Sequence, residues 1–181
     1  ISDVSSQILP SEEIDIIAYG CTSGTIAIGS DRIKEEVNKT KPKAKVTTPI
    51  TAALKAFKHL GLKNIAVLTP YPKDVNATVY DYLIDHNIGV ESFSSFNLEY
   101  DSEIAQVSLA SLEKEISKID LSNVDGLFVS CTALKIVDVL DRVESSQNTV
   151  VISSNQAIIW DCLRSVGIDS KIEGYGKLLV S

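Results

Sequence analysis

The 181-residue chain contains no methionine, only two histidines and three cysteines, and no cluster of lysine and arginine. Its formal net charge is −7, which argues against nucleic acid as a main partner. Its apolar runs are far too short to cross a membrane. We therefore expect a cytoplasmic protein that binds neither nucleic acid nor a membrane.

Familiar cofactor motifs are also missing. The stretch GCTSGT, residues 20–25, lacks the Gly-Lys-Ser/Thr of a P-loop, and no GxGxxG occurs in the chain. The histidines, cysteines and acidic residues do not follow a metal-ligand spacing. We therefore expect no cofactor and no metal.

The cysteines are too few and too scattered for a disulfide framework. An odd, sparse count favours free thiols, and Cys162 lies in the middle of an amphipathic segment, where we expect it to pack in the core. The chain begins at Ile1 and has no methionine, so we expect the N-terminal part of the fold to be missing from this sequence.

Short apolar runs alternate with amphipathic segments. The runs predict strands at 14–19, 44–48, 64–70, 89–93, 124–130 and 149–154. The amphipathic segments predict helices at 49–61, 101–119 and 155–167. This alternation is typical of an α/β fold with mostly parallel sheets and flanking helices.

The two halves of the chain resemble each other. Residues 14–28 align with 124–138, which places Cys21 on Cys131, and residues 46–61 align with 151–167. In this alignment Thr48 falls on Ser154. The duplication predicts two pseudo-symmetric lobes with the site between them. We expect a first lobe at 1–60 with an incomplete N-terminal part, a second lobe at 61–165, and a C-terminal segment at 166–181 that returns to the first.

Both Cys-Thr pairs follow a predicted strand, and we expect each to open a helix. Ligands of open α/β sheets bind at the carboxyl ends of the strands, and helix N-termini attract anions. Two thiols on opposite sides of a carboxylate suit proton transfer between two faces, or thiolate addition to a double bond. Each cysteine has a structural alternative, because a buried cysteine after a strand is commonly inert.

The motifs YGCTSGT and LFVSCTA, with the segments 46–76 and 150–164, resemble the aspartate/glutamate racemase superfamily. The closest likeness is to its branch of maleate cis-trans isomerases and arylmalonate decarboxylases, and it covers nearly the whole chain. The resemblance implies a cofactor-independent isomerase or racemase of a small carboxylate or dicarboxylate, working as a homodimer. It implies Cys21 and Cys131 as the catalytic residues. The substrate-binding residues that it implies are Thr22, Ser23, Tyr71 and Thr132, with Thr48, Asn76 and Ser154 as further candidates.

Three alternatives stay open. The first is a decarboxylase with Cys131 as proton donor, although the decarboxylases carry glycine at the position of Cys21. The second is a non-catalytic carboxylate-binding protein. The third is a redox protein with a Cys21–Cys131 disulfide. For the two-thiol enzyme we expect about 6–9 Å between the sulfurs, since each must reach a reacting carbon.

Overall fold

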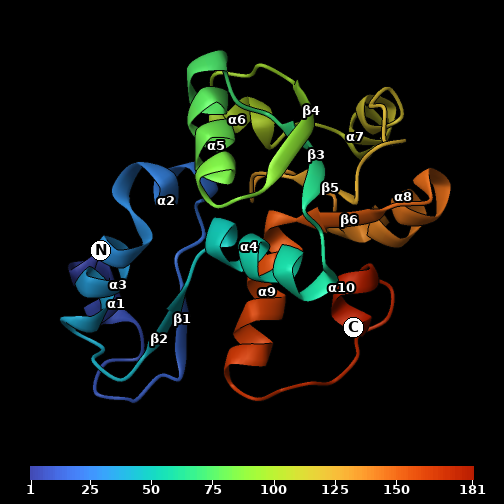
Figure 1. Ribbon diagram of the computed structural model, residues 1–181. Helices are drawn as coiled ribbons and strands as arrows, with labels where there is room; N and C mark the ends of the chain where they lie inside the picture. Colours follow the sequence, from blue (N-terminus) through green and yellow to red (C-terminus); the bar gives the residue numbers. More distant parts are fainter.

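The computed structural model describes residues 1–181 and contains two parallel sheets (Figure 1). The smaller sheet pairs β1 (Ile16–Ala18) with β2 (Lys45–Thr47). The larger sheet has the strand order β4-β3-β5-β6, with β3 at Asn64–Thr69, β4 at Gly89–Ser95, β5 at Gly126–Val129 and β6 at Val150–Ser153. All six predicted strands are present and all pairings are parallel, so the predicted α/β class is confirmed.

Helices flank both sheets. In chain order they are α1 (Ser2–Gln7), α2 (Thr22–Ile28), α3 (Ser30–Asn38), α4 (Pro49–Leu60), α5 (Lys73–Asp85), α6 (Asp101–Ile104), α7 (Leu109–Ile116), the 3₁₀ turn η1 (Val137–Val139), α8 (Leu140–Gln147), α9 (Ser154–Ser165) and α10 (Lys177–Val180). None of them is both long and apolar enough to cross a membrane.

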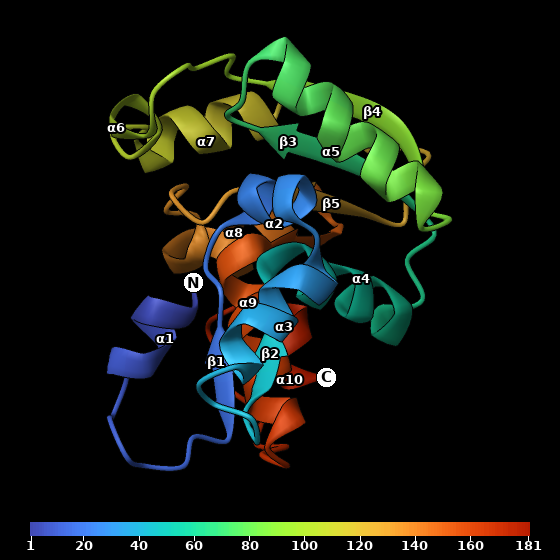
Figure 2. The same ribbon diagram turned by 90° about the vertical axis from the view of Figure 1, so that its left-hand side faces the viewer.

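Helices α4 and α9 lie side by side between the two sheets (Figures 1 and 2). Both begin with a capping box, formed by Thr48 with Thr51 in α4 and by Ser153 with Gln156 in α9. The caps therefore place Thr48 opposite Ser153, whereas the predicted alignment placed it opposite Ser154. The hydroxyl that matters for helix initiation is the one at the N-cap, which sequence alignment alone does not locate.

The same two helices also end alike, as predicted. Gly61 and Gly167 adopt left-handed φ angles of 73° and 79°, a region that glycine enters without steric penalty. In each case the amide that follows the glycine bonds back into the last helical turn, at 2.8 and 2.9 Å. The helices of the two strand–helix units, β2 with α4 and β6 with α9, therefore match at both ends. The second helix has one residue more between its N-cap and its terminal glycine.

A single large core of 34 buried residues covers the four-stranded sheet. Strands β3 and β5 are buried along nearly their whole length, which explains their continuously apolar sequences. Phe57 of α4 packs edge-on against Phe128 of β5, with ring centroids 5.4 Å apart. Leu178 and Leu179 of α10 join this core, and α10 contacts α9 and β6. The lobe boundaries at residues 60 and 165 stay a prediction.

The predicted helix at 101–119 is wrong in its continuity. The structure divides it into α6, which is one turn long, and α7, and the chain between them is not helical. Ser108 causes the break, since its hydroxyl accepts a hydrogen bond of 3.1 Å from the amide of Ser111 and so starts a new helix.

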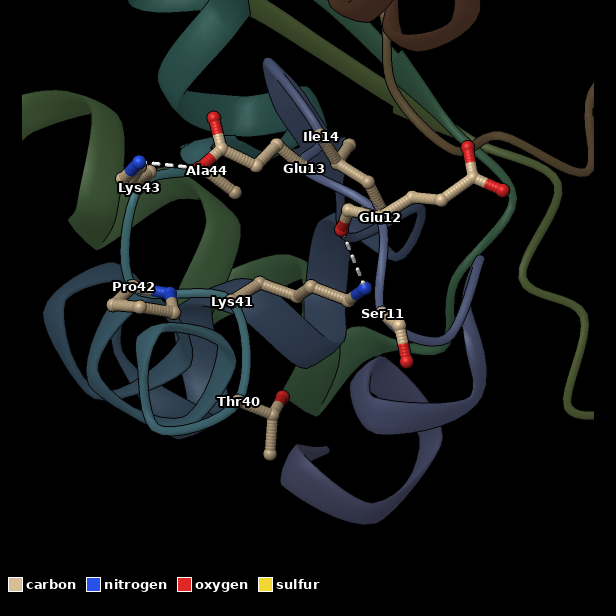
Figure 3. Close-up of a pocket in the computed structure, with 9 residues that line it drawn as sticks. All are labelled: Ser11, Glu12, Glu13, Ile14, Thr40, Lys41, Pro42, Lys43 and Ala44. Carbon is tan, nitrogen blue, oxygen red and sulfur yellow. Dashed lines mark hydrogen bonds and ion pairs between the residues drawn. The ribbon is translucent and has the colours of Figure 1, made fainter.

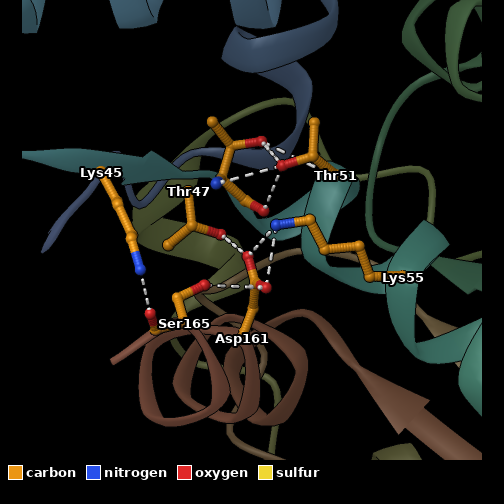
Figure 4. A network of polar contacts seen from close by, with 7 residues as sticks. Lys45, Thr47, Thr51, Lys55, Asp161 and Ser165 are labelled. Carbon is orange, nitrogen blue, oxygen red and sulfur yellow. Dashed lines mark hydrogen bonds and ion pairs between the residues drawn. The ribbon is translucent and has the colours of Figure 1, made fainter. Parts of the chain in front are cut away.

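A buried carboxylate fastens α9 to the first strand–helix unit (Figure 4). Asp161 accepts hydrogen bonds from Thr47 at 2.5 Å and from the ammonium group of Lys55 at 2.7 and 2.9 Å. Ser165 adds a longer contact of 3.4 Å. These bonds tie β2 and α4 to α9, and so hold the two strand–helix units in a fixed relation.

Candidate active site

Cys21 is the N-cap residue of α2, as predicted. Its side chain is exposed at the carboxyl end of β1, and its sulfur accepts a hydrogen bond of 3.3 Å from the amide of Gly24. The Ser23 hydroxyl lies 3.9 Å from the same sulfur. The first cysteine therefore stands at a helix N-terminus, where the peptide dipoles favour an anion.

Cys131 also follows a strand, β5, but the prediction that it opens a helix is wrong. The residues after it form turns, and the next helical residue is Val137. The φ angle of Cys131 is 114°, which L-residues rarely adopt. Asn155 of α9 stabilises this turn. Its side-chain amide donates hydrogen bonds to the carbonyl oxygens of Thr132 (2.9 Å) and Leu134 (3.5 Å).

One direct hydrogen bond and one bridge through Ser154 connect the cysteine segments across the molecule. The Thr132 hydroxyl donates to the carbonyl oxygen of Gly20 at 2.8 Å. The Ser154 hydroxyl lies 3.0 Å from that of Thr22 and accepts a 3.0 Å bond from the Cys131 amide. The residues on both sides of Cys21 are thus linked to the Cys131 segment, Gly20 directly through Thr132 and Thr22 indirectly through Ser154.

Tyr71, in the loop after β3, faces both cysteine segments. Tyr71 is 6% exposed, and its hydroxyl interacts with the Cys131 thiol and with the hydroxyl of Ser23, which lies two residues after Cys21. Burial, and then the neighbouring Cys131, raise the pKa of Tyr71 well above its usual range. The phenol therefore stays protonated and can donate a hydrogen bond to an anion.

The thiol of Cys131 differs from that of Cys21 in its environment. Cys131 is 8% exposed, and burial raises the pKa of its thiol. The Tyr71 hydroxyl and the amides of Ala133 and Leu134 act in the opposite direction, because they would bond to the thiolate. The net effect of burial leaves Cys131 a protonated thiol at neutral pH, which is suited to donating a proton.

Asn76 holds the Tyr71 loop from the first turn of α5. Its amide donates to the Tyr71 carbonyl oxygen at 2.8 Å, and its side-chain oxygen accepts a hydrogen bond from Thr69. The Ser95 hydroxyl donates to the same carbonyl at 2.6 Å. The Asn76 side chain is thus already bonded within the protein, and it fixes the backbone of Tyr71.

The predicted site residues divide into two groups. The first group lies around the two thiols, and it comprises Cys21, Ser23, Tyr71 and Cys131. Thr132 borders this group, but its hydroxyl already donates to the carbonyl oxygen of Gly20. The hydroxyls of the second group are bonded inside the protein. Thr48, 2% exposed, caps α4, while Thr22 and Ser154, 1% and 0% exposed, bond to each other. Thr22 still presents the amide that begins α2.

Sequence reasoning missed Tyr19 and Gly24. A Cβ atom on Gly24 would lie 2.9 Å from both the Cys21 sulfur and the Tyr19 hydroxyl, so only glycine leaves these two groups their places. Burial, and secondarily the nearby Cys21, raise the pKa of Tyr19. The available signal was the glycine in the first helical turn of GCTSG, where a better helix former is otherwise expected.

Other polar features lie away from the cysteines. A pocket between residues 11–14 and 40–44 lies at the amino ends of β1 and β2, opposite Cys21 (Figure 3). Its buried cation, Lys41, donates to the carbonyl oxygens of Leu9 at 2.7 Å and Glu12 at 3.1 Å. No group of three or more histidine, cysteine or acidic side chains is arranged to hold a metal ion. Cys162 is half-buried in α9.

The sequence matches the profile of the arylmalonate decarboxylase family over residues 14–179. A maleate isomerase from Alcaligenes faecalis is 20% identical over 186 residues, which cover 98% of this chain and 74% of that protein. An arylmalonate decarboxylase from Bordetella bronchiseptica is 30% identical over 141 residues, which cover 73% of this chain and 56% of that protein.

The fold has a solved counterpart. A maleate isomerase variant from Pseudomonas putida S16, crystallised with maleate, superimposes with a TM-score of 0.87 at 21% identity. The match covers 99% of this chain and 72% of that one. The likeness confirms the predicted architecture of the chain.

Proposed function

This chain belongs to the arylmalonate decarboxylase family, and we propose that it is a cofactor-independent two-cysteine isomerase or racemase of a small carboxylate, similar to maleate cis-trans isomerase. One observation carries the proposal: Cys21 and Cys131 are 110 positions apart, yet their neighbours are joined by a 2.8 Å hydrogen bond from the Thr132 hydroxyl to the Gly20 carbonyl oxygen. A one-thiol enzyme has no need of the first cysteine. The relatives that are maleate isomerases support a dicarboxylate substrate.

The two thiols take different roles because their environments differ. On maleate, the thiolate of Cys21 adds to one carbon of the double bond, and the displaced electron pair takes the proton of Cys131 at the other carbon. The remaining carbon–carbon single bond rotates. The Cys131 thiolate then removes a proton from that carbon, the double bond re-forms, and Cys21 leaves as thiolate. On a chiral carboxylate the same pair would remove and return a proton on opposite faces.

The carboxylates are bound by hydroxyls and amides rather than by cations. Ser23 and Tyr71 offer hydroxyl groups, and Thr22 and Thr132 offer backbone amides. The Thr22 amide lies at the start of α2, where an anion is favoured. Thr48, Asn76 and Ser154 contribute indirectly in this proposal, because their side chains are bonded within the protein.

A decarboxylase of substituted malonates is the second candidate. It is favoured by the 30% identity to the arylmalonate decarboxylase of Bordetella bronchiseptica. In that reaction Cys131 alone would protonate the anion left by loss of CO₂. The presence of Cys21 favours isomerisation instead.

A single NMR experiment separates these functions. The protein is incubated in D₂O with maleate, with phenylmalonate and with a panel of chiral carboxylates, without added cofactor. We expect conversion of maleate to its trans isomer, or deuterium exchange with inversion at a chiral carbon. Loss of CO₂ from phenylmalonate as the sole reaction would instead establish the decarboxylase, and binding without any turnover would establish a carboxylate-binding protein.

We also propose a homodimer in the cytoplasm. Three free cysteines support a reducing compartment, since unpaired thiols persist there. The dimer rests on the family resemblance, and light scattering of the purified chain tests it. The two-lobed division with boundaries at 60 and 165 is part of the same proposal, and limited proteolysis near these positions tests it.

A further inference from the structure

Ser154 and Thr22 are 132 positions apart in the sequence, yet their hydroxyl oxygens lie 3.0 Å apart in the interior. Neither side chain reaches solvent, since Ser154 is 0% and Thr22 is 1% exposed. The Ser154 oxygen also accepts a hydrogen bond of 3.0 Å from the backbone amide of Cys131. One buried oxygen therefore joins the helix that follows Cys21 to the backbone of Cys131.

The Cys131 backbone needs such a restraint. Its φ of 114° lies in a region that side-chain-bearing residues occupy only when the surroundings hold them there. In this conformation the thiol faces the Tyr71 hydroxyl and the amides of Ala133 and Leu134. A Cys131 that relaxed to a common φ angle would turn its thiol away from these groups.

We propose that Ser154 is a positioning residue, which holds Cys131 in the conformation that directs its thiol to Tyr71 and, through Thr22, ties that thiol to the Cys21 helix. Its significance for catalysis rests on the proposed two-cysteine function. The position of the thiol itself can be tested without turnover.

Ser130 provides a matched control. It lies next to Cys131, it is also 0% exposed, and its hydroxyl has no hydrogen-bond partner. Ser130→Ala and Ser154→Ala therefore remove the same atoms from equally buried positions beside the same cysteine. Only the second removes a bond to the cysteine backbone.

The first measurement is thiol alkylation. In a Cys21→Ser, Cys162→Ser background only Cys131 can react, and its rate with iodoacetamide is followed by mass spectrometry from pH 6 to pH 11. We expect the midpoint in Ser154→Ala to move upward by about one pH unit, because the thiolate loses hydrogen-bond donors while it stays buried. Ser130→Ala should keep the parent profile. A Ser154→Ala profile that coincides with that of Ser130→Ala, or moves to lower pH, would overturn the proposal.

The second measurement is turnover in the native background. We expect Ser154→Ala to lower kcat about 10- to 100-fold with KM changed less than about twofold, since the reacting group is displaced while the carboxylate contacts remain. Equal kcat values in Ser154→Ala and Ser130→Ala would contradict the assignment. If the parent protein turns over none of the substrates, the proposed function fails, while the alkylation profiles still decide the role of Ser154.

A folding defect in Ser154→Ala is detected by circular dichroism. In that event Thr22→Val is used instead. It removes the hydrogen bond between Thr22 and Ser154 and leaves the bond from the Cys131 amide to Ser154. We expect a smaller upward shift of the alkylation midpoint than the one given for Ser154→Ala. A Thr22→Val profile identical to that of Ser130→Ala would then overturn the proposal.

Discussion

The hydroxyl of Tyr71 lies against the thiol of Cys131, and both groups are almost completely buried, at 6% and 8% exposed. Burial raises the pKa of each, so both are neutral hydrogen-bond donors at neutral pH. Two neutral donors beside an anion stabilise its charge without repelling each other. The pair therefore provides a place where a carbanion or a carboxylate can be stabilised and protonated.

Replacing Tyr71 with Phe removes one of these donors and retains the ring that fills the core. We expect kcat/KM to fall about 100-fold, the usual effect of losing one donor to a developing anion. Tyr80→Phe is the control, since Tyr80 is 40% exposed and packs against Phe93 at the surface. A Tyr71→Phe enzyme within about threefold of the parent would show that the phenol does not contact the reacting anion.

The cysteines can be tested individually with serine variants, which change little in size. We expect Cys21→Ser and Cys131→Ser each to abolish isomerisation or racemisation while the circular dichroism spectrum stays native. Cys162→Ser should retain nearly full turnover, because Cys162 lies in α9, outside the proposed site. In a racemase, a single variant should still exchange one proton with D₂O but fail to invert the carbon. Full activity in Cys21→Ser would favour the decarboxylase.

The raised pKa values of the Cys131 thiol and the Tyr71 phenol also determine how the stability of the fold should depend on pH. A group whose pKa is raised on folding stabilises the protein below its unfolded pKa, and that stabilisation is lost as the pH rises toward the folded pKa. The unfolded values are about 8.5 for cysteine and about 10 for tyrosine. We therefore expect the melting temperature to fall steadily above about pH 8.5.

Tyr71→Phe separates the two contributions to this alkaline loss. Without the phenol, the decrease between pH 9.5 and pH 11 should be shallower than in the parent protein, while the part due to Cys131 remains. Parallel melting curves for the two proteins over this range would show that Tyr71 does not resist ionisation.

Substitution of Gly24 tests whether the Cys21 thiol needs the space that this glycine leaves free. Its φ is not left-handed, so alanine fits the backbone and even favours the helix, but the new Cβ would meet the Cys21 sulfur and the Tyr19 hydroxyl at 2.9 Å. We expect Gly24→Ala to lower activity about 10- to 100-fold by displacing the thiol. At Gly20 an added Cβ meets nothing within 4 Å, so Gly20→Ala should have a clearly smaller effect. Equal activities of the two variants would refute this account.

Periodicity and caps were sufficient to predict the architecture. The central strands β3 and β5 were predictable because their apolar runs are buried on both faces of a parallel sheet. The ends of α4 and α9 were predictable because Gly61 and Gly167 provide local signals. The break before α7 was not, because a serine inside a helical pattern can either continue a helix or cap a new one.

The residues of the candidate site could be proposed from the sequence, and their roles stay a prediction, whereas their geometry could not be proposed. The repeat located both cysteines, and Tyr71 came from the family resemblance. The φ of Cys131 and the bonding of Ser154 depend on contacts between residues far apart in the chain, which a linear pattern does not contain. Hydroxyls such as that of Thr48 are ambiguous in sequence, because the same group can bind a ligand or cap a helix.

The ion pair between Lys55 and Asp161 predicts an asymmetric effect on stability. The Asp161 side chain is 5% exposed and the Lys55 side chain is 53% exposed. Lys55→Met leaves a buried carboxylate without its cation, and only hydroxyl donors remain, so we expect the free energy of unfolding to fall by about 2 kcal/mol. Asp161→Asn leaves an ammonium group that can turn to water, and we expect a loss of about 1 kcal/mol. Urea unfolding measures both, with Lys58→Met on the exposed side of α4 as the control. If Asp161→Asn proved the more destabilising of the two, the carboxylate would be held mainly by Thr47 and Ser165 rather than by Lys55.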